Sequence, residues 1–383
     1  MKGKVHMICI EKALTQPLPS DIYTIGAPED VLFFDIETTG LSARSAGLYL
    51  IGILTYTADA SIAKGNLTAS SSDKAQISAV PPAHSTSSTP TSDDEGGHWT
   101  LLQYFCEDVA DEPAVLQAFF ELLRTKKTLI SYNGDGFDIP FLRHMLEQYG
   151  LPYSFDAVES FDLFKKFRPL KRLLNLPDLK LKSCERFLGI DREDRFTGGE
   201  LIEVYFEWQK TKAPALLDTL LLHNAEDIAN LPNLLPLLRY RSLPHSDFQL
   251  RAHERDECTI HLHYLSALTL PQPMDLRGDF WALHAEGNAV ELYVQLFEGE
   301  RKLFFADYYY LPAEDQVIHQ SLAEFVDRSA RKKACARNCY QRVSGCFLPE
   351  CSEVYTPALR AEYRDKLRYA QYSDTLFDDE AKA

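Results

Sequence analysis

The sequence lacks any long apolar run. No segment approaches the roughly 20 consecutive apolar residues that a membrane-spanning helix needs, and the opening stretch MKGKVHMICIEKALTQ has neither a long apolar core nor a small-residue cleavage site. These absences argue against a membrane partner and against a secretory signal. A cytoplasmic location is therefore expected.

An excess of positive charge is also missing. The chain has 40 Lys and Arg against 56 Asp and Glu, a formal net charge of −16. Such a balance argues against indiscriminate coating of nucleic acid, although it leaves room for a local basic track.

Paired CxxC motifs are absent as well. The eight cysteines are scattered, and without a secretory signal we expect reduced thiols. The C-terminal group lacks the spacing of common zinc sites and is expected to be thiols rather than zinc ligands; it comprises Cys335, Cys339, Cys346 and Cys351.

The length of 383 residues and a hydrophobic content of 45% fit a soluble globular protein of two domains. We expect an N-terminal lead-in over residues 1–29, a first domain over 30–240 and a small α+β domain over 245–383. Residues 58–98 change abruptly to Ser, Thr, Ala and Pro. This composition predicts a disordered insertion in a hairpin between strands at 48–56 and 99–105.

The first chemical motif is VLFFDIETTG, residues 31–40. Its apolar run predicts a buried strand, and Asp35 and Glu37 share one face because they are two residues apart. Two neighbouring buried carboxylates need a counter-charge, and a hard divalent cation such as Mg²⁺ is the simplest one. A lone pair of this kind is also common at strand ends that only reach solvent.

The second motif is NGDGFDIPFL. It predicts a strand-to-helix turn and a helix that begins near Asp138 and ends at Gly150. Asp135 is the better candidate for a helix cap, which leaves Asp138 free for another role.

The third motif, HNAEDIANL, lies in an apolar helix predicted over residues 214–240 and interrupted near Pro232. His223 and Asp227 are four residues apart and so lie on one helical face. The neighbouring Asn224 and Glu226 are expected to point elsewhere.

A basic track is predicted before the third motif. Its eight cations stand against only two acids, which indicates a phosphate-facing surface, with a solvated helix face as the alternative. The cations are Lys165, Lys166, Arg168, Lys171, Arg172, Lys180, Lys182 and Arg186.

With these three motifs in this order, the chain resembles the DEDD 3′–5′ exonuclease superfamily, and most closely its YprB-like ribonuclease H-like family. The resemblance covers about residues 30–240 and includes LKLKSCERFLGI before the last motif. It implies an α/β fold, a ribonuclease H-like mixed sheet flanked by helices.

The resemblance also implies site residues. Four carboxylates would bind metal, and His223 would lie beside the scissile phosphate. One branch of the superfamily has Tyr four residues before the last Asp and another has His five before it, whereas this chain has His at the Tyr-type spacing. The implied metal ligands are Asp35, Glu37, Asp138 and Asp227.

Phosphodiester cleavage requires an activated water and a neutralised leaving oxygen, and two ions about 4 Å apart provide both. We expect two Mg²⁺ or Mn²⁺ ions, with Asp35 bridging them and Asp138 on the leaving-group side. His223 is suited to accept the proton of the water. Nucleic-acid contacts are expected from Thr38, Asn133, Lys171, Arg172, Lys180 and Lys182.

The sequence therefore predicts a metal-dependent 3′–5′ exonuclease of DNA or RNA that acts on a single strand or a 3′ end. A ribonuclease H-type endonuclease and a non-catalytic nucleic-acid-binding protein with a nuclease fold are the alternatives. In the second domain a helix is expected at residues 320–331. Basic residues at 328–342, together with Tyr308, Tyr309, Tyr310 and Tyr340, suit a single strand.

Overall fold

The computed structural model describes residues 7–58, 97–305, 307–333, 335, 337–350, 359–373, 375 and 377. Most of the predicted insertion, residues 59–96, lies outside this part of the chain. The chain divides into two compact units, Met1–Leu238 and Arg239–Ala383.

The first unit is built on a six-stranded mixed sheet with the order β1-β4-β3-β2-β5-β6. Neighbours from β1 to β2 are antiparallel, while β2, β5 and β6 are parallel. The predicted α/β class is confirmed. The strands are β1 (Ile8–Leu14), β2 (Val31–Thr38), β3 (Leu48–Ala58), β4 (Gly97–Phe105), β5 (Thr128–Ser131) and β6 (Glu159–Asp162).

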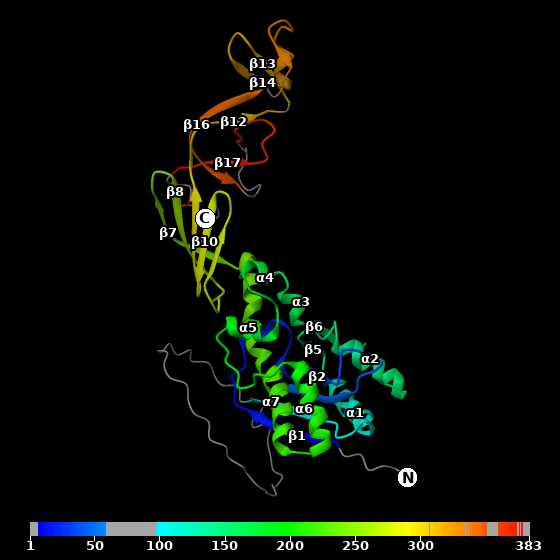
Figure 1. Cartoon of the computed structure of the whole chain (residues 1–383). Coiled ribbons are helices and arrows are strands. Elements are labelled where there is room, and N and C mark those ends of the chain that lie inside the picture. The colour runs from blue at the N-terminus through cyan, green and yellow to red at the C-terminus, as the bar shows by residue number, and fades with distance from the viewer. Residues whose placement is uncertain are drawn as a thin grey trace, which may run out of the picture. The chain divides into compact units, whose positions relative to one another are not determined.

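Helices cover both faces of this sheet (Figure 1). Alternate residues of β2, such as Leu32 and Phe34, pack with α1 and α2, whereas α6 and α7 pack against Tyr49, Leu50 and Phe105. The α-helices are α1 (Glu112–Leu123), α2 (Asp138–Tyr149), α3 (Leu163–Phe167), α4 (Leu170–Leu173), α5 (Leu181–Phe187), α6 (Gly198–Thr211) and α7 (Pro214–Asn230). The 3-10 helices are η1 (Ser20–Thr24), η2 (Pro28–Asp30), η3 (Val109–Asp111) and η4 (Pro232–Leu238).

The predicted hairpin and helices are present, with two refinements. The lead-in supplies a strand of the sheet, because β1 pairs antiparallel with β4. The last helix of the motif region ends at Asn230, and η4 follows at Pro232, where proline cannot donate a backbone hydrogen bond.

A glycine lets α7 approach the sheet. Gly52 on β3 is the register partner of Asp35 on β2. A Cβ atom at this position would lie 2.0 Å from Oδ1 of Asn224 and 2.2 Å from Cδ1 of Ile228. Any larger residue would push α7 away from the carboxylates of β2.

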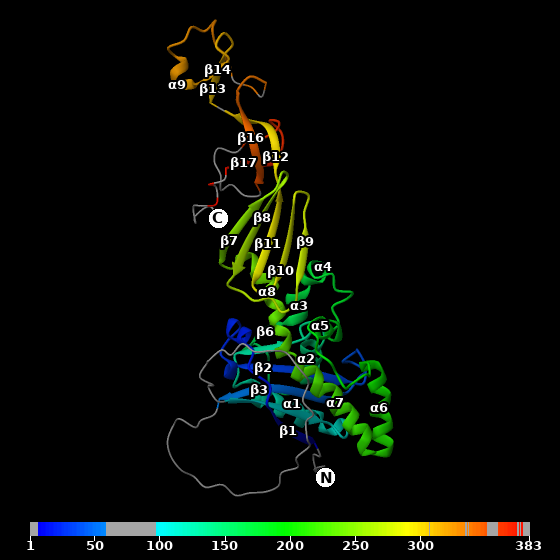
Figure 2. The same cartoon turned by 90° about the vertical axis from the view of Figure 1, so that its left-hand side faces the viewer.

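The described part of the second unit is built mainly of strands. Figure 2 shows β7, β8, β11, β10 and β9 side by side in one sheet, and two three-stranded sheets have the orders β12-β16-β17 and β14-β13-β15. The strands are β7 (Phe248–Arg255), β8 (Thr259–Ser266), β9 (Met274–Arg277), β10 (Trp281–Glu286), β11 (Ala289–Gln295), β12 (Phe297–Phe304), β13 (Tyr308–Leu311), β14 (Gln316–His319), β15 (Lys332–Lys333), β16 (Tyr340–Glu350) and β17 (Arg368–Gln371).

Helical content in this unit is smaller than predicted. The helices of its described residues are α8 (Arg239–Ser242), η5 (Leu243–His245) and α9 (Gln320–Ala323). The predicted helix at 320–331 is wrong beyond Ala323. Asp327 accepts hydrogen bonds from the backbone and hydroxyl of Ser329 at 2.8 and 2.7 Å, and such local side-chain bonds compete with a helix.

None of the helices in the described residues has the length and apolar character needed to cross a bilayer. The described cysteines are free thiols, and Cys351 lies outside the described residues.

Candidate active site

Two carboxylates of the site come from β2, on the face that α7 covers. Nδ2 of Asn224 on α7 donates to Oδ2 of Asp35 at 3.2 Å. The hydroxyl of Tyr49 donates to Oε2 of Glu37 at 3.4 Å. The spacing of Asp35 and Glu37 thus has the predicted result, because alternate residues of a strand share one face.

Asp138 joins them from the first position of α2. Its side chain is buried, and Oδ1 accepts a hydrogen bond from the backbone N–H of Ile36 at 3.1 Å. The turn before α2 is tight: Asn133 has a φ of 68°, and its N–H donates to Oδ1 of Asp162 at 2.9 Å. This turn brings the start of α2 back to β2.

His223 and Asp227 come from successive turns of α7. Nε2 of His223 lies 3.7 Å from Oε1 of Glu37 and 3.5 Å from Oδ2 of Asp227. Ligand atoms of Glu37, His223 and Asp227 all lie within 4.8 Å of one another. This geometry is able to hold a metal ion.

The other ring nitrogen of His223 is held by a residue that the sequence motifs did not indicate. Nδ1 lies 2.7 Å from Oδ2 of Asp194, whose side chain is 1% exposed. Lys182 pairs with the same Oδ2 at 2.8 Å. Burial alone would raise the pKa of Asp194, but the hydrogen bonds from Lys182, Phe196 and His223 lower it. Asp194 is thus a charged partner for the imidazole.

The carboxylates share one electrostatic field. Burial, followed by the charges of Asp138, Glu37 and Asp227, raises the pKa of Asp35 well above its ordinary value. Burial and the charges of Asp227 and Asp138 raise the pKa of Glu37 in the same way, and burial raises the pKa of Asp138 to about 7. Crowded buried carboxylates are stabilised by a bound cation, and all-oxygen donors suit Mg²⁺ and Mn²⁺. The donor set therefore fits a divalent metal.

One cation of the protein already reaches this cluster. The guanidinium of Arg192, 6% exposed, forms an ion pair with Asp227. It also pairs with Glu226 at 3.4 Å and with Glu185 at 3.2 Å. Arg192 therefore neutralises part of the negative charge of the site.

Two predictions about the neighbours of Asp227 have different outcomes. Asn224 does not point elsewhere, since it bonds to Asp35; the prediction missed that residues three apart also share a helical face. Glu226 does turn away from the carboxylates of β2 and accepts from the backbone N–H groups of Glu193 and Asp194, both at 2.9 Å. Asp194 and Arg192 lie between α5 and α6, where no spacing rule marks them.

The residues expected to touch nucleic acid have different environments. Thr38 is buried, with Oγ1 donating to the carbonyl of Gly40 at 2.8 Å, and Lys182 is paired with Asp194. Lys165 of the wider track pairs with Asp135 at 2.6 Å. Exposed positions are occupied by Asn133, Lys171, Arg172 and Lys180.

Comparison with known proteins supports the fold. Residues 90–239 match the model of the RNase_H superfamily, so the first unit has a ribonuclease H-like fold. No curated protein matches the chain.

Two solved structures are similar in part. One, described as the apo form of a nuclease, is 16% identical, with 57% of this chain and 75% of that chain covered and a TM-score of 0.28. The other is a zinc-bound form of the E. coli ExoI–ssDNA complex, 15% identical, with 49% and 42% covered and a TM-score of 0.27.

Proposed function

We propose that the first unit is a metal-dependent nuclease that hydrolyses phosphodiester bonds of DNA or RNA, as a 3′–5′ exonuclease. The observation that carries this proposal is the convergence of carboxylates from β2, α2 and α7, with the imidazole of His223 beside two of them. Asp35, Glu37, Asp138 and Asp227 interact electrostatically, and His223 Nε2 faces Glu37 and Asp227.

The four carboxylates would hold two Mg²⁺ or Mn²⁺ ions, since Asp35 interacts electrostatically with Asp138, Glu37 and Asp227. When bound, such ions make water more acidic and offset the charge that develops on the leaving oxygen. The hydrogen bond from Ile36 fixes Asp138, and those from Asn224 and Tyr49 fix the acids of β2.

His223 is suited to accept the proton of the attacking water. With Asp194 charged, Nδ1 is the protonated nitrogen and donates to it, which leaves the lone pair of Nε2 directed toward Glu37 and Asp227. Asp194 holds the tautomer and the orientation, a positioning role like that of the acid in a hydrolytic triad.

The substrate would lie along the exposed polar groups near these elements. Asn133, Lys171, Arg172 and Lys180 are exposed and suited to contact phosphates or sugars. Thr38 and Lys182 remain part of the proposed surface, although each already has an intramolecular partner.

One observation favours a second candidate, a nucleic-acid-binding protein that does not turn over. Arg192 already pairs with Asp227, and a carboxylate neutralised by an arginine binds a metal ion less well. In that case the site would bind nucleic acid without hydrolysis.

Incubation of the purified chain with a 5′-labelled single strand, with and without Mg²⁺ or Mn²⁺, separates these functions. A 3′–5′ exonuclease gives a metal-dependent ladder that shortens from the 3′ end, and it leaves circular or 3′-blocked strands intact. Cleavage of the circular strand, or of an RNA–DNA hybrid at internal positions, would mean that the protein is an endonuclease and not an exonuclease. Binding without any product in either metal would overturn hydrolysis.

A further inference from the structure

One face of the five-stranded sheet in the second unit carries a cluster that the nuclease site does not use. His261 and His263 alternate along β8 and so share a face. In the register of the sheet, Glu254 on β7 is the partner of His261, and Glu291 on β11 is the partner of His263. Four potential metal ligands or ligand partners therefore meet on three adjacent strands.

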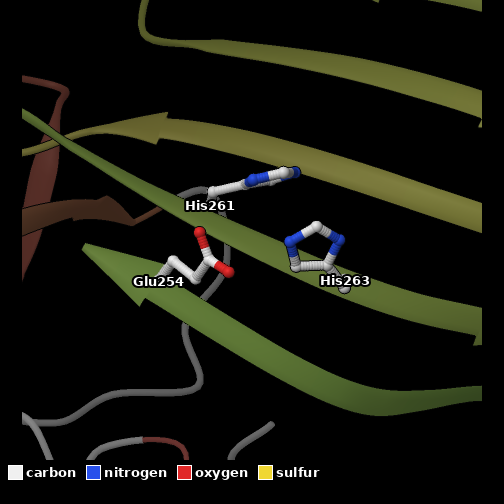
Figure 3. A group of neighbouring side chains, drawn as sticks. All are labelled: Glu254, His261 and His263. Atoms are coloured by element: carbon white, nitrogen blue, oxygen red, sulfur yellow. The ribbon is translucent and has the colours of Figure 1, made fainter. Parts of the chain in front are cut away.

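The side chains of this cluster are close together. Figure 3 shows the carboxylate of Glu254 turned toward the imidazole rings of His261 and His263. One ligand atom from each of the three residues lies within 4.8 Å of the others, and the ring centroids of the two histidines are 3.8 Å apart. Such an arrangement brings two nitrogen donors and one oxygen donor to a common point.

Hydrogen bonding within the protein does not account for this arrangement. Nε2 of His261 is shielded from solvent and has no hydrogen-bond partner among the described residues. Glu291 lies 3.7 Å from this nitrogen and 3.9 Å from Nδ1 of His263. Both separations exceed hydrogen-bonding distance, so this shielded nitrogen has no hydrogen-bond partner among the described residues.

We propose that Glu254, His261 and His263 bind a Zn²⁺ ion. Imidazole nitrogens favour zinc over Mg²⁺ and Ca²⁺, and two histidines with one carboxylate form a known zinc donor set with one position left open. Tetrahedral bonds of 2.0–2.1 Å require ligand atoms about 3.4 Å apart. Glu254 is exposed, so rotation of its side chain is able to close the remaining gap.

Neighbouring groups hold the ligands in position. The ring of Tyr293 stacks on His261 with centroids 3.9 Å apart and an angle of 15°. The hydroxyl of Tyr293 donates to Oε2 of Glu291 at 3.1 Å, and Glu291 lies beside both imidazoles. The stacked ring of Tyr293 therefore restrains the imidazole of His261.

The ion would join β7 to the body of the sheet. β7 is an edge strand of this sheet, and its pairing with β8 shifts register between Leu250 and Ala252. A bond from Glu254 through zinc to β8 would hold the end of β7 beyond this irregularity. We therefore expect zinc to slow amide hydrogen exchange in Phe248–Arg255.

The test is a zinc titration of the metal-free full chain against a chromophoric chelator, in excess Mg²⁺ so that the carboxylate cluster of the first unit is occupied. His263→Ala and Glu254→Gln are the test variants. His245→Ala and Glu257→Gln are the controls, because both residues are exposed positions of the same unit. All five proteins keep the same eight cysteines, so thiol binding is common to them.

We expect one zinc site of equal affinity in the wild type and in both controls. His263→Ala should weaken zinc binding by about 100-fold or more, because a directly bound ligand contributes at least as much as an outer partner. Zinc should protect β7 from exchange in the wild type and not in His263→Ala. Equal stoichiometry and affinity in the wild type and both test variants would overturn the proposal. In a sixth protein, His223→Ala, loss of the zinc site with both test variants unaffected would assign the zinc to the first unit and would also overturn the proposal. Neither readout depends on nucleic-acid hydrolysis.

Discussion

The two candidate metal clusters combine the same residue types in opposite ways. In the first unit, β2, α2 and α7 contribute Asp35, Asp138 and His223, and the acids are so buried and crowded that their pKa values rise. In the second unit, neighbouring strands contribute Glu254, His261 and His263, which are half-buried or exposed. The first cluster has carboxylates in excess and suits hard ions, whereas the second has imidazoles in excess and suits zinc.

The contrast shows what burial adds to a site. Repulsion among buried carboxylates destabilises the metal-free protein, and binding of cations relieves it. The cluster on the sheet face has little of this strain, because solvent reaches its acids. Metal binding at the first site should therefore change both the activity and the stability of its unit. Metal binding at the second site should change only the local order of the strands around it.

The largest expected effect is on cleavage. Asp35→Asn should lower the rate by roughly 10³-fold or more, because groups that act as a unit lose most of the rate when one is removed. Glu254→Gln in the second unit is the control and should cleave like the wild type. Initial rates on a labelled strand in Mg²⁺ and Mn²⁺ measure both. Comparable losses of cleavage rate in the two variants would mean that the two clusters do not have separate roles.

A somewhat smaller effect is expected at the imidazole. His223→Gln should lower the rate by about two to four orders of magnitude, the range of general-base catalysis, and should leave Mn²⁺ affinity nearly unchanged. Asp194→Asn should also slow cleavage and alter the pH profile of the rate, because the carboxylate no longer sets the tautomer.

Single-turnover rates and Mn²⁺ titrations distinguish these roles. His263→Ala is the matched control, as it removes an imidazole from the other cluster. A loss of Mn²⁺ affinity in His223→Gln that matches its loss of rate would make His223 a metal ligand instead of a base.

A moderate effect is expected on binding. Replacement of Lys171, Arg172 and Lys180 by Ala should flatten the slope of log affinity against log salt by about 0.7 to 0.9 for each phosphate that is no longer neutralised. Titration of a labelled single strand in Ca²⁺ at several salt concentrations gives the slope. Lys210→Ala, an exposed position that pairs with Glu207, is the control. An unchanged slope in the triple variant would remove these residues from the substrate path.

The smallest effect is on thermal stability. The pKa of Asp138 is about 7 in the folded state against 3.8 for an ordinary Asp, so the folded state binds more protons between these values. Stability of the metal-free first unit should therefore fall as pH rises from about 4 to about 7. Asp35→Asn should reduce this fall, and Mg²⁺ should reverse it.

Thermal unfolding in a chelator at several pH values measures this change. A change of 1 kcal/mol in the free energy of unfolding should shift the melting temperature by about 2–4 °C. Glu147→Gln removes an exposed carboxylate of α2 and should behave like the wild type. If the stability of the wild type rises over this pH range, and the stability of Asp35→Asn falls, then the charges of the carboxylates are already neutralised by groups such as Arg192.

Sequence patterns were sufficient where a local rule applies. The alternation in VLFFDIET placed Asp35 and Glu37 on one face, and the positive φ of Gly150 (61°) ends α2 as expected. The ribonuclease H-like fold was implied by the family resemblance that the three ordered motifs carry.

Long-range partners were beyond such rules. Asp194 reaches His223 only because the loop between α5 and α6 folds back on α7, and no residue spacing encodes that return. The cluster of His261 and His263 was missed for a different reason. Their alternation on β8 is visible in the sequence, but Glu254 joins them through strand pairing across a turn.

The strand order of the first unit has a consequence for folding on the ribosome. β1 is made first but pairs only with β4, which follows much later in the chain. Until Gly97–Phe105 has left the exit tunnel, Ile8–Leu14 does not have its native partner strand. Because such non-local pairing delays folding, Ile8–Leu14 of the nascent chain should gain protease resistance only after β4 emerges.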